Sequence, residues 1–211
     1  MGELLMRLFP GLDMGQSGWL WEDPRDQPWT ALVDLDVRLQ AAKARLGTCD
    51  GINEGIVRCH WIVVEDGAAI EPNVMLTGGP IVVRRGAVVR AGARINGPSY
   101  IGVDCVVGHA TEVNRGILLD GSKCPHFAFV GHSVVGHRAN LGAGVRLSNR
   151  RLDRRSVRVW ISGVPVDTGM RYFGALVGDE AEVGCNAVLN PGTVLLPRAT
   201  VLPLASVRGA P

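Results

Sequence analysis

The stretch that decides the fold runs from Val83 to Leu119 and reads VRRGAVVRAGARINGPSYIGVDCVVGHATEVNRGILL. Within it an aliphatic residue returns at every sixth position: Val83, Val89, Ile95, Ile101, Val107, Val113 and Leu119. A period of six matches neither the 3.6 residues per turn of a helix nor the alternation of a long strand. It fits short strands separated by tight turns, in which one large residue of every six points inward.

The same period continues on both sides of this stretch. Its further members are Val64, Ile70 and Leu76 upstream, and Val130, Val135, Leu141, Leu147, Val177, Val183, Leu189, Leu195, Val201 and Val207 downstream. Three such segments make one triangular coil, and stacked coils pair as parallel strands about 4.7–4.9 Å apart. The repeat therefore predicts an all-β fold, a single-stranded parallel β-helix of hexapeptide repeats. Residues 120–129 interrupt the series and residues 148–176 form a long insertion, and such loops on a solenoid are where function is usually placed.

The chain divides into two regions. We expect residues 1–58 to form an N-terminal arm with a capping helix, and residues 59–211 to form the β-helix with an inserted loop at 148–176. Apolar residues at helical spacing predict the helix within residues 29–46, before Gly47. They are Leu32, Leu35, Leu39, Ala42 and Leu46. A helix that precedes a solenoid can cover its open end, where unpaired strand edges would invite association. We therefore expect an N-terminal helical cap.

Composition and charge exclude several classes of protein. Lys and Arg number 22 against 20 Asp and Glu, a net charge of +2, which argues against nucleic acid and membrane partners. No apolar run approaches ~18 residues, so no membrane span is expected, and residues 1–15 lack a secretory signal. The five cysteines include no CxxC pair, which disfavours disulfides and structural zinc and favours a reducing compartment. We expect a cytoplasmic protein without a metal.

Four short motifs go beyond the generic repeat. They are Lys-x-Pro-His at 123–126, Asn-Leu-Gly-Ala-Gly at 140–144, Val-x-Val-x-Ile-x-Gly at 157–163 and Val-Asp-Thr-Gly at 166–169. With them, residues 64–205 resemble the C-terminal acetyltransferase domain of the bifunctional glucosamine-1-phosphate N-acetyltransferase/UDP-N-acetylglucosamine pyrophosphorylases, of the sugar-1-phosphate nucleotidylyltransferase type. No Gly-rich nucleotide loop lies near the N-terminus, so we expect the nucleotidylyltransferase domain to be missing.

The resemblance implies both an assembly and an activity. It implies a left-handed β-helix that forms a homotrimer with its sites between subunits. It also implies a CoA-dependent N-acyltransferase, which uses acetyl-CoA as cosubstrate and acts on an amino-sugar phosphate or a nucleotide-linked amino sugar. The expected partners are therefore a small-molecule sugar phosphate or nucleotide sugar. The alternative is a non-catalytic trimeric sugar-nucleotide-binding or scaffold protein derived from that domain.

The resemblance also assigns catalytic residues. The family's catalytic histidine falls on His126, which would take a proton from the sugar amine as the amine attacks the thioester. Histidine is the side chain that titrates nearest neutral pH, which suits this transfer. The family's sugar- and acetyl-contacting asparagines fall on Asn140 and Asn149. We assign Asn149 to catalysis and Asn140 to substrate binding, because an amide can both donate and accept hydrogen bonds.

Binding residues follow from the same resemblance. Arg90 and Arg155 fall on phosphate contacts, for which the planar guanidinium is well suited. Gly142 and Ala143 fall on the backbone beside the thioester, where their N–H groups would stabilise developing oxyanion charge.

Three positions depart from the family. Asn114 stands in place of a lysine that grips the sugar phosphate, and Phe129 in place of a tyrosine that touches substrate. Cys185 stands in place of a serine near CoA. By position, we assign Asn114 and Phe129 to substrate binding and Cys185 to cofactor binding.

The remaining polar residues have less specific interpretations. His109, His132 and His137 each follow a glycine in a repeat turn, and we expect all three to be solvated. Zinc binding by His132 and His137 is disfavoured because they occupy equivalent turns on different faces of the coil. An arginine cluster would bind phosphate or CoA, or would form a solvated loop or a subunit contact. Its members are Arg146, Arg150, Arg151, Arg154, Arg155 and Arg158.

Overall fold

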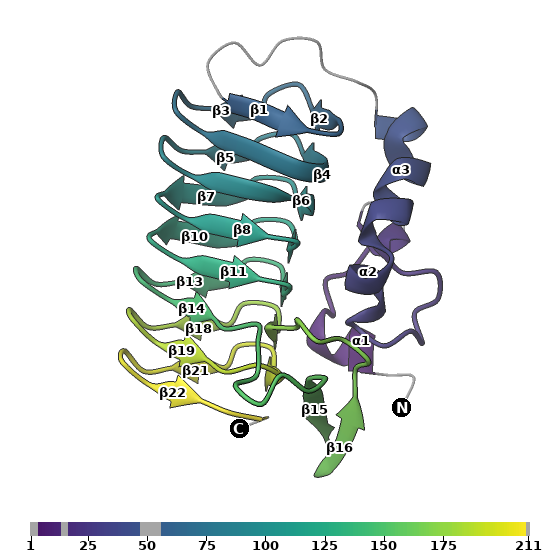
Figure 1. The fold of residues 1–211 in the computed structure, drawn as a ribbon, viewed down its shortest axis with the longest axis vertical. Coiled ribbons are helices and arrows are strands. Elements are labelled where there is room, and N and C mark those ends of the chain that lie inside the picture. Colours follow the sequence, from purple (N-terminus) through teal and green to yellow (C-terminus); the bar gives the residue numbers. More distant parts are fainter. Residues whose placement is uncertain (1–3, 14–16, 47–55, 210–211) are drawn as a thin grey trace.

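The structure, a computed structural model, describes residues 4–13, 17–46 and 56–209. Stacked triangular coils form a solenoid, and a mainly helical N-terminal segment runs along one side of it (Figure 1). The architecture is the left-handed parallel β-helix that the repeat and the resemblance predict, and nearly all its strand pairs are parallel. None of the helices in the described ranges is long and apolar enough to cross a membrane.

Each coil contributes one strand to each of three faces, called here A, B and C. Face A contains β3 (Ala69–Ile70), β5 (Val88–Val89), β7 (Val106–His109), β10 (Lys123–His126), β13 (Asn140–Leu141), β18 (Glu182–Val183) and β21 (Thr200–Val201). Face B contains β1 (Ile56–Cys59), the first parts of β4 (Met75–Val83) and β6 (Arg94–Ile101), β8 (Glu112–Asn114), β11 (Phe129–Gly131), β14 (Arg146–Leu147), β19 (Val188–Leu189) and β22 (Ser206–Val207). Face C contains β2 (Ile62–Val64), the second parts of β4 and β6, β9 (Ile117–Leu118), β12 (Val134–Val135), β17 (Ala175–Val177) and β20 (Thr193–Leu195).

The interior of the solenoid is a stack of aliphatic rows, as the period of six predicts. Val89 pairs in register with Val107, and Val107 pairs with Cys124, all three inside the core. Fully burying one such aliphatic side chain contributes about 1.5–3 kcal/mol. Cys124 therefore fills an aliphatic position, and Ala128 fills the small position that follows it.

This register corrects one expectation from the sequence. Residues 120–129 do not form an interruption but one regular coil, because a buried thiol packs as a small apolar group. One correction of detail accompanies it. Leu118 rather than Leu119 points into the core, and Leu119 packs instead among the residues beneath the N-terminal arm.

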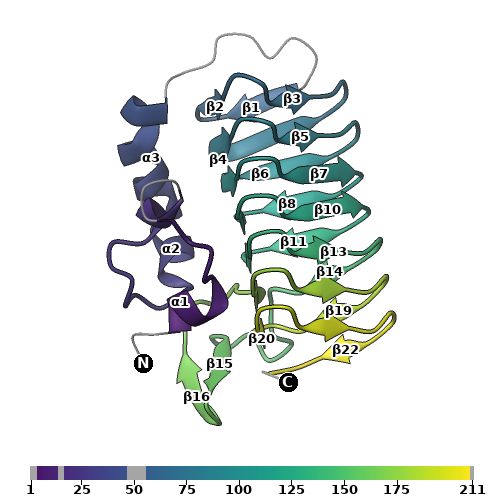
Figure 2. The same ribbon diagram turned by 180° about the vertical axis from the view of Figure 1, so that it is seen from behind.

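The N-terminal arm lies on face C and does not cover the open end of the solenoid. Its helices are α1 (Leu4–Leu8), α2 (Thr30–Val33) and α3 (Leu35–Leu46), with a short 3-10 turn, η1 (Gly18–Leu20). Both views show α3 beside the stack of coils and running along it (Figures 1 and 2). The expected capping position is therefore wrong, because the outward residues of face C are themselves apolar and need cover. They are Val63, Val82, Tyr100, Ile117, Val134, Leu176 and Val194.

Aromatic side chains anchor the arm on this face. Trp21 and Trp29 are buried, and Trp29 meets Phe173 edge-on with ring centroids 6.4 Å apart. Trp19 meets Tyr100 in the same way at 5.8 Å. The arm and face C therefore form a second apolar core outside the coils.

The insertion contains an antiparallel hairpin. Its strands are β15 (Arg158–Ile161) and β16 (Val164–Asp167), and the hairpin projects next to the arm (Figure 1). Val157 and Val159 are buried among the residues of the arm. The insertion is thus an ordered element that leaves the B–C corner of the solenoid and returns to it at β17.

Candidate functional site

Four expected site residues lie along the corner between faces A and B. His126 pairs in register with His109 of the preceding coil. The carbonyl of His126 accepts the N–H of Gly144 at 3.0 Å, and the carbonyl of Ala143 accepts that of Asn186 at 2.8 Å. His126, Ala143 and Cys185 therefore occupy the same position in successive coils, about 5 Å apart per coil, with Gly142 beside Ala143. We call this row the A–B column.

The imidazole of His126 faces outward at this corner. Its side chain is exposed and accepts or donates no hydrogen bond to any of the described residues. Its ring lies 6.3 Å from that of Phe127, whose side chain is 52% exposed. His109, in contrast, holds the carbonyl of Ala91 through Nδ1 at 2.7 Å. His126 is the histidine of this corner that is available to a ligand.

The two expected oxyanion donors differ in availability. The N–H of Gly142 donates to the Val183 carbonyl at 2.7 Å, as part of the ladder between coils. Within the described residues, the N–H of Ala143 has no such acceptor. Of these two N–H groups, only that of Ala143 is available to a ligand among the described residues.

Arg90 and Asn140 lie near the A–B column. Arg90 is exposed at the end of β5, and by register it precedes the same corner two coils before His126. Asn140 is half-buried on face A, and its Nδ2 donates to the Glu182 carboxylate at 3.0 Å.

The other expected residues lie across face B or beyond it. Asn149 is half-buried at the B–C corner, where its Nδ2 donates to Nδ1 of His132 at 2.9 Å. Asn114 lies at the end of β8, one coil before His132, and its Oδ1 accepts from Asn96 at 3.1 Å. Phe129 sits between the corners on β11. Arg155 is exposed in the insertion.

Consequently, one copy of the chain does not bring His126 and Asn149 together. His126 lies at one edge of face B, and Asn149 contacts His132 at the other edge. The chain crosses the face between His126 and His132, a span of about 15–20 Å at ~3.3 Å per residue. A small acceptor at His126 cannot touch Asn149 of the same copy.

His132 and Tyr172 are functional candidates that sequence reasoning missed. The rings of His132 and Tyr172 stack with centroids 5.6 Å apart and an interplanar angle of 28°. Burial, and secondarily the charge of Arg115, lowers the pKa of His132 to about 4. The position of His132 in a repeat turn does not predict its burial, because Tyr172, which stacks on it, belongs to the insertion.

His137 also differs from expectation. It is 5% exposed, and it lies against Gly11 of the arm and Asp179 of the next coil. Of the three histidines expected to be solvated, only His109 is exposed. No group of three potential metal ligands occurs within the described part of the chain.

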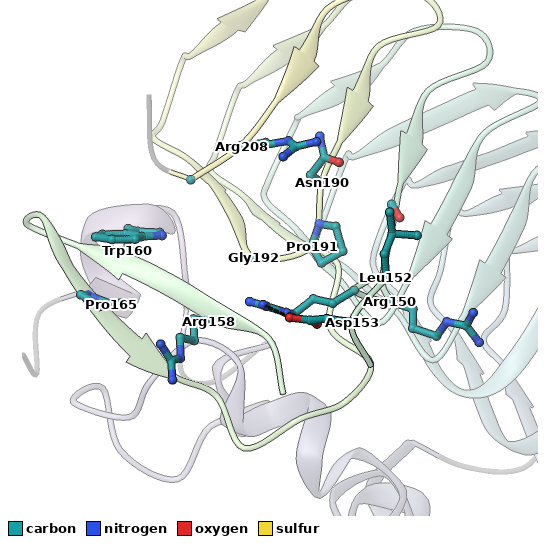
Figure 3. A pocket seen from close by; sticks show the side chains of 13 residues that line it. Arg150, Leu152, Asp153, Arg158, Trp160, Pro165, Asn190, Pro191, Gly192 and Arg208 are labelled. Carbon is teal, nitrogen blue, oxygen red and sulfur yellow. Dashed lines mark hydrogen bonds and ion pairs between the residues drawn. The ribbon is translucent and has the colours of Figure 1, made fainter. Parts of the chain in front are cut away.

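A pocket of about 670 Å³ lies between the hairpin and the last coils. Figure 3 shows Trp160, Pro165 and Arg158 on the hairpin side and Asn190, Pro191 and Arg208 on the coil side. The ion pair of Arg151 and Asp153 also lines it. The remaining lining residues are Ser148, Arg150, Leu152, Gly192 and Gly209.

Comparison with known proteins gives a family and several partial relatives. Residues 77–203 match the family described as the GMPPB C-terminal domain. A bifunctional sugar-1-phosphate nucleotidylyltransferase/acetyltransferase of Sulfurisphaera tokodaii is 35% identical over 101 residues, 48% of this chain and 25% of that protein. The bifunctional protein GlmU of Methanococcus maripaludis strain C5 is 31% identical over 149 residues, 62% of this chain and 36% of that protein. The chain thus spans only about a quarter to a third of these relatives.

A solved structure is also similar. A putative acetyltransferase from Bacillus cereus superposes with a TM-score of 0.38 and 16% identity, covering 75% of this chain and 81% of that chain.

Proposed function

This chain belongs to the GMPPB C-terminal domain family, and on that premise we propose that it is a CoA-dependent N-acyltransferase. Its acceptor is an amino-sugar phosphate or a nucleotide-linked amino sugar, and acetyl-CoA is the acyl donor. The partial similarity to proteins named as acetyltransferases supports this choice. The observation that carries it is the A–B column, which places an exposed imidazole in line with Ala143 and Cys185.

The geometry suits the transfer of an acetyl group at this corner. An extended thioester lying along the A–B column would pass Cys185 and Ala143 and present its carbonyl carbon near His126. The sugar amine attacks this carbon, a C–N bond forms, and the C–S bond to coenzyme A breaks. His126 takes the proton from the amine and returns it to the departing thiolate, while the Ala143 N–H stabilises the oxyanion.

A complete site then requires two copies of the chain. Asn149 reaches an acceptor at His126 only from a neighbouring copy, and Arg155 would bring a phosphate contact from the same neighbour. Arg90 and Asn140 would come from the copy that supplies His126. We infer a homotrimer, in which each site joins the A–B column of one copy to the insertion of the next.

The direct test is acetyl transfer from acetyl-CoA to glucosamine 1-phosphate and related amino sugars. We expect His126→Ala to lower kcat at least 100-fold, the usual contribution of a general base. His109→Ala is the matched control, because His109 occupies the same corner one coil earlier. Equal rates for the wild type and His126→Ala would reject the assigned base.

The same assay separates this proposal from a scaffold role. A catalyst binds acetyl-CoA and turns it over with an amino sugar. A wild-type protein that binds a nucleotide sugar but neither binds nor consumes acetyl-CoA would be the non-catalytic binding protein instead.

A further inference from the structure

Positive charge is concentrated in the insertion. Residues 148–176 carry six arginines and two aspartates, a net +4, whereas the whole chain carries only +2. The rest of the chain is therefore slightly negative, and a polyanion would be drawn to this region. Both aspartates already have partners, since Asp153 pairs with Arg151 and Asp167 accepts from Ser156.

The pocket beside the hairpin combines this charge with a flat apolar wall. Arg150, Arg158 and Arg208 are exposed and form no ion pair within the described ranges. Trp160 is 48% exposed, and Figure 3 places it with Pro165 on the hairpin side. A volume of about 670 Å³ lies within the range of small-molecule sites, ~300–1,000 Å³.

The pocket has an ordered support. Gly192 forms part of its lining, and a Cβ added there would lie 2.1 Å from the carbonyl oxygen of Arg158. The start of β15 therefore packs directly on the backbone of the next-to-last coil. The hairpin and the coils hold the two sides of the pocket at a set spacing.

We propose that this pocket binds a nucleoside diphosphate moiety, at a site separate from His126. The base stacks on the exposed ring of Trp160, as bases do on aromatic side chains elsewhere. The phosphates lie against the arginines that line the pocket, whose forked donors match phosphate oxygens. A simple sugar phosphate has no flat ring for the Trp160 side of the pocket, and an uncharged nucleoside leaves the arginines without a partner.

The test is calorimetric titration with UDP and GDP, with uridine and pyrophosphate as fragments. We expect either nucleotide to bind at least about tenfold more tightly than uridine, because uridine lacks the charged contacts. Trp160→Ala should weaken nucleotide binding about tenfold and leave pyrophosphate unchanged, and Trp160→Phe should restore most of it. The double variant Arg158→Gln/Arg208→Gln should weaken both ligands.

The controls separate the pocket from general surface charge and from the acyl-transfer site. Arg94→Gln removes an exposed arginine on β6, far along the solenoid, and should leave nucleotide binding unchanged. His126→Ala should also leave UDP and GDP binding unchanged, because His126 does not line this pocket, whereas acetyl transfer should be lost. Failure of one proposal is therefore distinguishable from failure of the other. Absence of UDP and GDP binding, or binding that the double arginine variant does not weaken, would overturn the proposal.

The same moiety occurs in sugar nucleotides and in coenzyme A, and separate titrations distinguish them. The ligand that occupies the pocket is the one whose affinity falls in Trp160→Ala, whether this is a UDP-sugar, coenzyme A or both. If Trp160→Ala changes the affinity of neither, the assignment is wrong.

Discussion

His132 is held neutral beside Asn149, and this has a consequence for stability. Burial lowers the pKa of His132 to about 4, below the value of about 6.5 for a free imidazole. Its Nδ1 accepts the Asn149 amide, so the ring proton sits on Nε2. Protonation would oblige Nδ1 to become a donor and would break this contact.

We therefore expect acid to destabilise the protein through this residue. The unfolded chain binds the proton more tightly than the folded chain, so the contribution of His132 is complete above pH ~6.5 and is lost as the pH falls toward 4. Urea unfolding at several pH values measures it. His132→Phe keeps an aromatic ring for Tyr172 but cannot titrate, so it should flatten the profile in this range. Identical profiles for the two proteins would contradict the prediction.

Glycines at the A–B corner permit the close stacking of coils. A Cβ added to Gly108 would lie 1.7 Å from the carbonyl oxygen of Pro125 in the next coil. We expect Gly108→Ala to lower the free energy of unfolding by about 3 kcal/mol through overpacking. Gly163, in the hairpin turn, has no heavy atom within 4 Å of such a Cβ and a φ of 79°. Gly163→Ala should therefore cost only about 1 kcal/mol of backbone strain. A larger loss for Gly163→Ala in urea unfolding would refute the steric explanation.

At the scale of elements, the arm is tied to the solenoid by Asp179. Its carboxylate accepts the N–H of Gly11 and the N–H of His137, both at 2.8 Å. Its own N–H donates to the carbonyl of Leu8 at 2.9 Å. Burial raises the pKa of Asp179, and the two N–H donors oppose this rise.

Asp179→Ala should release the first helix of the arm. Loss of the two contacts to a buried carboxylate costs about 2–3 kcal/mol, and we expect faster hydrogen exchange of the amides in residues 4–13. Glu180→Ala is the matched control, because the Glu180 side chain makes surface ion pairs with Arg138 and Arg198, both of which lie outside the arm. Equal exchange in both variants would show that the carboxylate does not hold the arm.

Elements differ in how far the sequence predicts them. The period of six identifies the faces because every strand places one large aliphatic residue inside the core. Cys124 interrupts this aliphatic pattern in the sequence but does not interrupt the coil. The spacing of Leu32, Leu35 and Leu39 predicts a helix but does not predict where on the solenoid this helix packs. The sequence signal for this position lies in face C, where two apolar residues follow each other, as in Val82–Val83. One of the two faces the core and the other faces outward, where the arm covers it.

The candidate site was less predictable than the fold, because it depends on distances between coils. The resemblance selects residues by position along the chain, and the structure divides them between the two edges of face B. Tyr172 and Trp160 lie in the insertion, outside the repeat, so no periodicity marks them. Their place follows only from how the hairpin packs on the coils.

At the scale of the whole molecule, the two edges of face B suggest a complementation experiment. His126→Ala and Asn149→Ala should each be inactive alone. If each site joins two copies, mixing the two variants under conditions of subunit exchange should restore about a quarter of the sites by random assembly. Acetyl transfer by the mixture measures this. No recovery, with exchange verified by mass spectrometry, would show that the two residues do not share a site between copies.

The arm also changes how the solenoid comes apart. A stack in which each coil contacts only its neighbours tends to fray from its ends and to unfold in parts rather than cooperatively. Here α3 rests on β4 and β6, while Leu8 and Gly11 are fastened to Asp179 several coils away. The arm therefore links the coils of β4 and β6 to the coil of Asp179, and we expect the coils between these anchor points to unfold together rather than one at a time.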